Sequence, residues 1–286
     1  DAVTLTKVYE AVSEYLGFGY IEAGKTMGLA PYGRFDDRFK DLFINGRGNK
    51  NMVTPNYPAG AHIDTDRYPQ LARQDDPRAW HRDPGKATTI SKDLAWAVQH
   101  ECQARLAVLI TRAIELTGQT NIVLSGGFAL NCVANYEMLA SFPDINLWVD
   151  PVAHDGGTAI GLARLIWHTK NASSKIMPLS TAYLGETYVI RDIQPSDEIS
   201  NKPVTTKDVA DLISQGQVVA IFQGAAEAGP RALGNRTIAY DPRDPAGKDT
   251  VNRIKGREWF RPFAGSVMAE HADDWFDLRG VPDSPF

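Results

Sequence analysis

The stretch Asn121-Ile-Val-Leu-Ser-Gly-Gly-Phe-Ala-Leu-Asn-Cys-Val-Ala-Asn-Tyr-Glu-Met-Leu139 decides the fold class of this chain. Residues 121–125 form a short apolar run with β-branched members, which is typical of a strand. The pair Gly126-Gly127 interrupts that run, and residues 128–139 have the composition of a helix. A strand that passes through a glycine turn into a helix is the repeating unit of α/β domains, so we predict an α/β fold.

The same alternation extends to both sides of this stretch. Upstream, Ser91–Leu116 carries an apolar stripe at helical spacing and ends before Gly118, a typical C-terminal cap. Downstream, the pattern predicts a strand at Ile145–Val149, a turn at Asp155–Gly157 and a helix at Thr158–Trp167. These elements together indicate an α/β domain that occupies the middle of the chain.

The two ends of the chain show further elements. A helix is predicted at Leu5–Leu16, and the polar segment Asn45–Pro84 is expected to be a long loop with a short strand or two. Asn171–Pro203 has the composition of a linker. After it, a helix at Val209–Ile213 and a strand at Val218–Phe222 predict a second α/β unit.

Composition limits the class of protein. The 286 residues suffice for one large or two medium domains, and 43% hydrophobic and 23% charged residues are ordinary for a globular protein. No apolar run approaches the roughly 20 residues that span a membrane, and the first residues lack the basic and apolar regions of a signal peptide. The two cysteines, Cys102 and Cys132, form no metal-type pair. We therefore expect a reducing, cytoplasmic location.

Charge is distributed unevenly along the chain. The formal net charge is −5, which disfavours nucleic acid as a partner, because binding to a phosphate backbone needs a basic face. Residues 223–263, in contrast, carry eight basic and five acidic residues. A basic focus within an acidic protein favours a small anionic ligand over a polyanion.

The basic focus contains two motifs. We name Gly224-Ala-Ala-Glu-Ala-Gly-Pro-Arg-Ala-Leu-Gly-Asn-Arg236 the glycine–arginine segment, and Asn252-Arg-Ile-Lys-Gly-Arg-Glu-Trp-Phe-Arg-Pro-Phe263 the arginine-rich segment. The planar fork of arginine matches phosphate oxygens in pairs, and glycines let backbone N–H groups approach an anion. These residues predict a site for a phosphate-type anion, with a solvated basic surface as the alternative.

Three shorter segments each allow a functional and a purely structural interpretation. The turn Gly126-Gly127 permits close approach of a nucleotide, and it also serves as a tight connection between strand and helix. In the segment that follows His154, Asp155 either binds a metal or caps the next helix, and the cap is favoured. Gly24-Lys-Thr-Met-Gly28 lacks the spacing of a phosphate-binding P-loop, so its alternative is an ordinary loop.

Together, these motifs resemble the O-carbamoyltransferase family that modifies nodulation factors and antibiotics, the NodU-like enzymes. The matching stretches are Gly24-Lys-Thr-Met-Gly-Leu-Ala-Pro-Tyr-Gly33, Leu124-Ser-Gly-Gly-Phe-Ala-Leu-Asn-Cys132, His154-Asp-Gly-Gly-Thr-Ala-Ile-Gly161, Gly229-Pro-Arg-Ala-Leu-Gly-Asn-Arg236 with Asp241-Pro-Arg243, and Lys255-x-Arg257-Glu-x-Phe-Arg-Pro-Phe263. Their order and spacing agree with the family over nearly the whole chain.

The resemblance implies two partial domains and a two-step reaction. Residues 1–176 would be the later part of an actin-like ATPase (ASKHA) domain related to threonylcarbamoyl transferases, and residues 177–286 the early part of a YrdC-like domain. The YrdC-like part would join carbamoyl phosphate with ATP as carbamoyl-adenylate. The actin-like part would transfer the carbamoyl group to a hydroxyl of a sugar-containing or natural-product acceptor. The implied cofactors are ATP, Mg²⁺ and iron(II) or another divalent metal, and the resemblance allows a homodimer without nucleic acid or membrane partners.

The resemblance also assigns roles to single residues. Asp155 would be catalytic and a metal ligand, and Lys25 would reach the activated carbamoyl intermediate. The residues implied to line a nucleotide or acceptor pocket are Gly126, Gly127 and Asn131. The residues implied to hold carbamoyl phosphate and the phosphates of ATP are Arg231, Lys255, Arg257 and Arg261.

The chain departs from the family pattern at both ends. A paired-histidine metal motif and a catalytic histidine of the family's N-terminal part are absent, as is a C-terminal segment of the YrdC-like domain. We therefore expect a fragment of a longer polypeptide, which by itself lacks part of the catalytic apparatus. Two alternatives stay open: a relative that serves tRNA threonylcarbamoylation or hydrogenase maturation, and a catalytically incomplete nucleotide-binding module.

Overall fold

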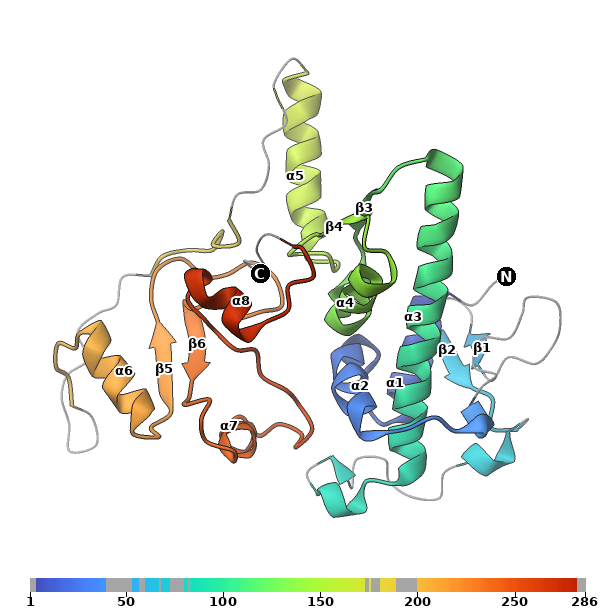
Figure 1. Cartoon of the computed structure of the whole chain (residues 1–286), viewed down its shortest axis with the longest axis horizontal. Coiled ribbons are helices and arrows are strands. Elements are labelled where there is room, and N and C mark those ends of the chain that lie inside the picture. Colours follow the sequence, from blue (N-terminus) through green and yellow to red (C-terminus); the bar gives the residue numbers. More distant parts are fainter. Residues whose placement is uncertain are drawn as a thin grey trace.

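The computed structural model describes residues 4–39, 53–56, 60–66, 68–72, 80–81, 83–172, 175, 181–188 and 200–281. In these residues, helices are combined with three two-stranded sheets (Figure 1). The mixture of helices and strands confirms the α/β prediction. Among the described helices, none has the length and apolar character needed to cross a membrane.

Three helices pack together on one side of the molecule (Figure 1). α1 (Leu5–Tyr15) begins after Thr4, whose hydroxyl accepts an N–H of the first turn, and α2 (Ala23–Leu29) follows it. The long α3 (Thr89–Thr117) ends at Gly118, whose φ of +66° allows the chain to leave the helix. The helices predicted at Leu5–Leu16 and Ser91–Leu116 are therefore present at nearly the predicted bounds.

A hydrophobic core joins these helices to segments that are distant in sequence. The buried members of this core include Leu16, Phe39, Trp80, Leu94 and Phe260. Phe260 belongs to the arginine-rich segment and is only 1% exposed. Burying such a side chain contributes roughly 1.5–3 kcal/mol, so the arginine-rich segment is anchored to the helices. The predicted domain boundary at residues 176 and 177 lies outside the described residues and stays a prediction, as does most of the predicted linker.

The segment predicted as a long loop, 45–84, is described in part. It contains β1 (Val53–Asn56) and β2 (Gly60–Ile63), which pair antiparallel with Val53 opposite Ile63. The short strand or two expected there are thus confirmed. β2 contacts α1, so this sheet lies against the helices.

A parallel pair of strands forms the middle of the chain. β3 (Asn121–Leu124) pairs with β4 (Asn146–Val149). α4 (Cys132–Ser141) connects them, and its buried Met138 belongs to a hydrophobic cluster against which apolar side chains of both strands pack. α5 (Gly157–Lys170) follows β4 and projects from the rest of the molecule (Figure 1).

The helix predicted at residues 128–139 begins later than expected. Residues 127–130 form a short 3₁₀ turn, and α4 starts only at Cys132. The reason is the side chain of Asn131, which accepts the N–H of Ala134 at 3.0 Å and thereby caps α4.

The remaining elements are α6 (Thr206–Ser214), β5 (Val219–Phe222), β6 (Arg236–Ala239), α7 (Gly247–Ile254) and α8 (Ala272–Trp275). β5 and β6 are antiparallel, with Phe222 opposite Arg236. The glycine–arginine segment is therefore the connection between two paired strands. The strand predicted before this segment is confirmed as β5, whereas the strand β6, in which the segment ends, was not predicted.

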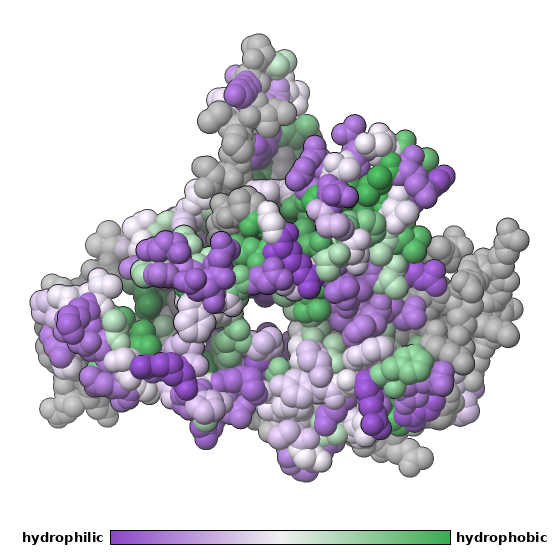
Figure 2. Space-filling model, in the orientation of Figure 1, coloured by the Kyte–Doolittle hydropathy of each residue, from purple (hydrophilic) through white to green (hydrophobic). Residues whose placement is uncertain are grey.

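The chain between α7 and α8 runs toward α2 and back again (Figure 1). The molecule is hollowed between the part that holds α2 and α4 and the part that holds β6 and α7 (Figure 2). The residues predicted to bind ligands belong to segments on both sides of this hollow.

Candidate anion-binding site

Lys25 lies on α2 and is held by two carboxylates. Its ammonium Nζ is 2.5 Å from Glu22 Oε1 and 2.8 Å from Glu258 Oε1, and its side chain is only 16% exposed. Burial alone would lower the pKa of Lys25, but the hydrogen bonds to Glu22 and Glu258 outweigh it, so the pKa lies above its ordinary value. Lys25 thus links α2 to the arginine-rich segment, and sequence reasoning had missed Glu258 as its partner.

Apolar contacts reinforce this link. A Cβ atom added to Gly28 would lie 3.2 Å from Pro262 Cδ, so the two segments touch where α2 has no side chain. The rings of Tyr32 and Trp259 meet edge to face, with centroids 4.7 Å apart. The first and last motifs of the family pattern are therefore in direct contact.

The other three motifs also lie against one another. Gly126, with φ of +93°, donates its N–H to the carbonyl of Ala153 at 2.8 Å. A Cβ atom on Gly229 would lie 2.9 Å from the carbonyl oxygen of Pro151. The glycine–arginine segment, the turn after β3 and the turn after β4 therefore meet through their backbones, and at Gly229 a side chain would prevent so close an approach.

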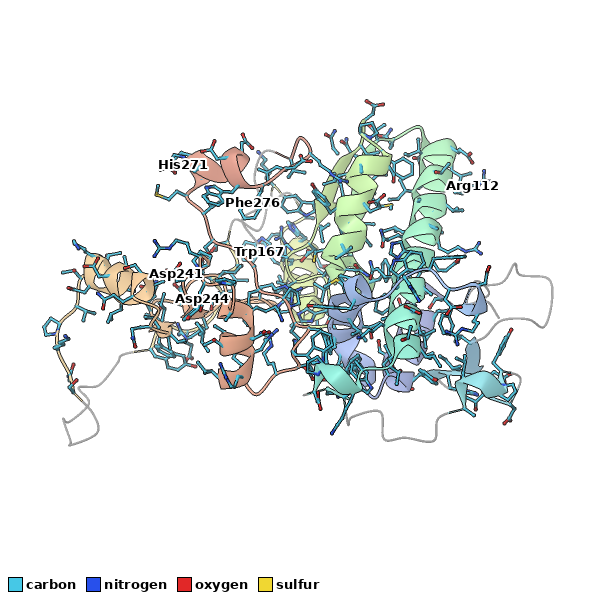
Figure 3. The ribbon with its side chains drawn as sticks, turned by 60° about the horizontal axis from the view of Figure 1, so that its bottom comes forward. Arg112, Trp167, Asp241, Asp244, His271 and Phe276 are labelled. Carbon is cyan, nitrogen blue, oxygen red and sulfur yellow. The ribbon has the colours of Figure 1, made fainter. Side chains whose placement is uncertain are left out.

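Arg236 and Arg243 are already occupied by partners within their own segments. The Arg236 guanidinium stacks on the ring of Phe222 at 3.7 Å and donates to the carbonyls of Gln223 and Asn235. Arg243 binds both carboxylate oxygens of Asp241, which lowers the pKa of Asp241 to about 2. Figure 3 shows Asp241 close to Asp244, in the connection between β6 and α7. Both guanidinium groups are therefore engaged by partners of their own segments.

Arg231, Arg257 and Arg261 form what we call the arginine cluster. Burial lowers the pKa of Arg257, and the positive charges of Arg261 and Arg231 lower it further, although Glu258 opposes them. The Nε of Arg257 is buried and has no hydrogen-bond partner among the described residues. Arg231 is exposed, and no described residue forms a hydrogen bond or ion pair with its guanidinium. An added anion would satisfy these donors and relieve the repulsion between the three charges.

Lys255 lies apart from the arginine cluster in its contacts. It is the C-terminal cap residue of α7, its side chain is exposed, and no contact with the arginine cluster is present in the described part of the chain. Its predicted role therefore rests on its place in the motif. It stays a prediction.

Asp155 lies in the turn before α5, and the prediction that it caps this helix is wrong. The cap residue is Gly156, without a side-chain hydrogen bond. The N–H of Gly156 is instead donated to Nδ1 of His154 at 2.9 Å, and a Cβ atom on Gly157 would lie 2.1 Å from the carbonyl of Val152. This tight turn leaves the Asp155 carboxylate exposed, without a hydrogen bond or ion pair to any described residue.

The residues described do not by themselves form a metal site. No group of three His, Cys, Asp or Glu side chains comes together among them. Asp155 would supply a single carboxylate, whereas divalent metals take several ligands. A metal at Asp155 would thus need ligands beyond the residues that the structure describes.

Asn131 is buried and belongs to a network of side-chain hydrogen bonds. Its side-chain oxygen accepts from Ala134 N–H and from Gln99 Nε2, and its amide donates to Gln99 Oε1, all at 3.0 Å. Gln99 in turn accepts the hydroxyl of Tyr9 at 2.7 Å. This buried network joins α1, α3 and α4, and no local sequence pattern predicts the partners of Asn131. Gly126 and the neighbouring Gly127 are exposed at the end of β3.

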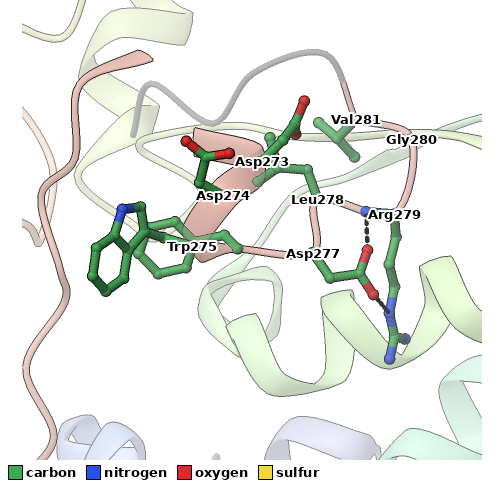
Figure 4. Close-up of a pocket in the computed structure, with 9 residues that line it drawn as sticks. Asp273, Asp274, Trp275, Asp277, Leu278, Arg279, Gly280 and Val281 are labelled. Atoms are coloured by element: carbon green, nitrogen blue, oxygen red, sulfur yellow. Dashed lines mark hydrogen bonds and ion pairs between the residues drawn. The ribbon is translucent and has the colours of Figure 1, made fainter. Parts of the chain in front are cut away.

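A shallow pocket lies at α8, outside all of these motifs in the sequence. It is lined by residues 273–281, including Asp273, Asp274 and Asp277 (Figure 4). Arg279 binds Asp277 at 3.8 Å and stacks on Tyr136 of α4. None of the predicted site residues lines this pocket, and its acidic lining does not suit an anion.

Replacement of Lys25 by methionine is expected to destabilise the protein by about 1–3 kcal/mol, because half-buried Glu258 would lose the closer of its two cations among the described residues and keep only Arg261, at 3.4 Å. The matched control is Lys207→Met, which removes an exposed pair with Asp211 and should cost under about 0.5 kcal/mol. Denaturant unfolding at pH 7 measures both values. Equal losses in the two variants would contradict a special role for Lys25.

The same link predicts how stability depends on pH. Hydrogen bonds to Lys25 outweigh the burial that raises the pKa of Glu258, so this pKa lies below the ordinary value. The contribution of Glu258 is therefore complete above about pH 4.3, the usual glutamate pKa, and is lost as pH falls through its lowered pKa. The contribution of Lys25 to stability is complete below about pH 10.4, the usual lysine pKa, and is lost as pH rises through the raised pKa of Lys25. The stability difference between wild type and Lys25→Met should shrink outside this window.

Comparison with known protein families accounts for nearly the whole chain. Residues 2–164 match the family described as Carbamoyltransferase N-terminus, and residues 210–286 match Carbamoyltransferase C-terminus. Together the two matches include all five motifs and every residue of the arginine cluster.

Individual relatives agree with this result. An uncharacterized protein of Synechocystis is 35% identical over 96% of this chain and 48% of its own length. Nodulation protein NolNO of Sinorhizobium fredii is 33% identical over 99% of this chain and 41% of its own length. Nodulation protein NolO of Bradyrhizobium diazoefficiens is 32% identical over 97% of this chain and 51% of its own length. The chain thus spans about half the length of the curated relatives it matches.

Proposed function

Because the chain belongs to the carbamoyltransferase family, we propose that it is an ATP-dependent O-carbamoyltransferase, or a large part of one, whose arginine cluster binds carbamoyl phosphate and ATP. The observation that carries the proposal is the state of Arg257. Its guanidinium is partly buried beside two further arginines, and its Nε has no partner among the described residues. Such a group is stabilised by an anion that brings several oxygen acceptors.

The two substrates suit this cluster. Carbamoyl phosphate and the triphosphate of ATP each present several anionic oxygens, which arginines bind in pairs. Activating a carbamoyl group as an adenylate requires alignment and charge neutralisation more than covalent help from the protein. Arg231, Arg257 and Arg261 would supply both, with Lys255 as an additional cation at the edge of the site.

The first step consumes one molecule of water. Water hydrolyses carbamoyl phosphate to carbamate and orthophosphate, and the P–O bond to the carbamoyl group is broken. A carbamate oxygen then attacks the α-phosphorus of ATP, and pyrophosphate leaves. The products are carbamoyl-adenylate, pyrophosphate and orthophosphate. The arginine cluster would hold each leaving phosphate as its negative charge increases.

The second step would take place at the turn that carries Asp155. The hydroxyl of the acceptor attacks the carbamoyl carbon, its proton is removed, and AMP leaves. The Asp155 carboxylate is exposed and unpaired among the described residues, which suits a group that receives or orients this proton. We further propose that the exposed backbone of Gly126 and Gly127 borders the acceptor or nucleotide, and that Asn131 supports their turn as the cap of α4.

Other elements of the proposal come from the family resemblance. Residues 1–176 would belong to an actin-like domain and residues 177–286 to a YrdC-like domain. Lys25, which is paired with Glu22 and Glu258, would reach the carbamoyl intermediate with the remaining N–H of its ammonium group. Mg²⁺ with ATP, iron(II) or another divalent metal, a cytoplasmic location and a homodimer complete the proposal. The proposed acceptor, a sugar-containing or natural-product molecule with a hydroxyl group, likewise comes from the family resemblance.

Pyrophosphate release tests the proposed function. The full-length protein is mixed with ATP and Mg²⁺, with and without carbamoyl phosphate, and pyrophosphate is measured by a coupled enzyme assay. We expect release that depends on carbamoyl phosphate. Its absence in the presence of both substrates and a panel of hydroxylated sugars would overturn the proposal.

A further inference from the structure

Glu227 organises the glycine–arginine segment from within. Its Oε1 accepts three backbone N–H groups of the same segment, from Leu233 at 2.9 Å, Asn235 at 2.8 Å and Arg236 at 3.1 Å. Burial would raise the pKa of Glu227, but these N–H groups outweigh it and the pKa lies below its ordinary value. One carboxylate oxygen therefore gathers the second half of the segment around itself.

The two ends of the segment are fixed by a separate set of contacts. Arg236 stacks on Phe222 and donates to the carbonyls of Gln223, Gly224 and Asn235. Arg236 and Glu227 form no ion pair with each other in the described residues. The two charged side chains thus hold different groups: Arg236 binds carbonyl oxygens near the strands, and Glu227 binds N–H groups in the loop.

Arg231 lies between two fixed points of this loop. On one side, Gly229 has φ of +102° and lies directly against the carbonyl of Pro151. On the other side, Leu233 donates its N–H to Glu227, and its carbonyl accepts the hydroxyl of Tyr183 at 2.7 Å. The backbone is therefore restrained on both sides of Arg231, while the Arg231 side chain has no hydrogen-bond partner among the described residues.

We propose that Glu227 is a positioning residue, which fixes the backbone on the C-terminal side of Arg231 and so directs the Arg231 guanidinium toward the anion held by Arg257. This inference rests on the proposed function, because it assumes that the arginine cluster binds an anion. Glu227 itself would not touch that anion, because two carboxylate or phosphate charges would repel each other.

The expected effect follows from the cost of ordering a loop. Without the Glu227 carboxylate, three N–H groups lose their shared acceptor, and the loop must be ordered at the moment of binding. Phosphate affinity should then fall by about 10- to 100-fold. A glutamine keeps an acceptor oxygen in nearly the same place, so Glu227→Gln should recover much of the loss.

The test combines amide hydrogen exchange with direct binding of inorganic phosphate. Wild type, Glu227→Ala, Glu227→Gln, Arg231→Ala and the control Glu270→Gln, which changes an exposed glutamate of the chain, are compared. Exchange is followed at the amides of Leu233, Asn235 and Arg236. Phosphate binding is measured by calorimetry.

We expect Glu227→Ala to exchange faster at these three amides and to bind phosphate more weakly, with Glu227→Gln in between and Glu270→Gln like wild type. If Glu227→Ala does not fold, the glutamine variant alone decides, because a partial loss at the same amides is expected there. Unchanged exchange at these amides, or phosphate binding like that of wild type, would overturn the inference.

The two proposals fail in different ways. If Arg231→Ala abolishes phosphate binding while both Glu227 variants bind normally, the anion site stands and the role of Glu227 is wrong. If wild type binds no phosphate, the anion site itself is wrong, and the inference about Glu227 is lost with it.

Discussion

Arg231→Ala is expected to reduce pyrophosphate release from ATP and carbamoyl phosphate by at least about 100-fold. Arg231 is a member of the arginine cluster that has no hydrogen bond or ion pair among the described residues, so its charge is available to a ligand. Removing a preorganised charged donor from a site where negative charge develops has a large effect on the rate. The measurement is the coupled pyrophosphate assay with the full-length protein at saturating ATP.

The matched control for this prediction is Arg243→Ala. Arg243 lies in the same family pattern but is bound by both oxygens of Asp241, so its positive charge is already neutralised by a carboxylate. We expect this variant to retain pyrophosphate release to within about threefold. A similar loss in both variants would show that general positive charge, and not the arginine cluster, supports the reaction.

Asp155→Ala is expected to leave pyrophosphate release nearly intact and to reduce carbamoylation of an acceptor by about 100-fold or more. The carboxylate is exposed in the turn before α5 and does not cap this helix, whose cap residue is Gly156. It is therefore available for the second step. Labelled carbamoyl phosphate, with the acceptor separated and counted, measures that step.

Asp144→Ala is the control, because Asp144 is an exposed aspartate in the connection between α4 and β4. It should affect neither step. If Arg231→Ala and Asp155→Ala lose the same step to the same degree, the proposed division between activation and transfer is wrong.

Local structure was largely predictable from the sequence. The helices α1 and α3 and the strands β3 and β4 agree with hydrophobic periodicity and glycine stops, because both signals act between near neighbours in the chain. The start of α4 was predicted too early, since the side chain of Asn131 competes with the helix for the N–H of Ala134.

The contacts that assemble the candidate site could not be predicted in the same way. The pairing of Lys25 with Glu258, the burial of Phe260 in the helical core and the approach of Gly229 to Pro151 all join residues far apart in sequence. No local pattern specifies such partners. Even so, Glu258 lies between two arginines of the motif, and a lone acidic residue in that position is a signal that can be sought in other chains.

The central claim is that carbamoyl phosphate is activated by ATP as an adenylate at the arginine cluster, and the identity of the products tests it most directly. The full-length protein is incubated with ¹³C-labelled carbamoyl phosphate, ATP and Mg²⁺, and the products are followed by ³¹P and ¹³C nuclear magnetic resonance. We predict equal amounts of pyrophosphate and orthophosphate, with no ADP and with a labelled carbamoyl-adenylate or its acceptor product. Formation of ADP, or orthophosphate without pyrophosphate, would contradict the claim.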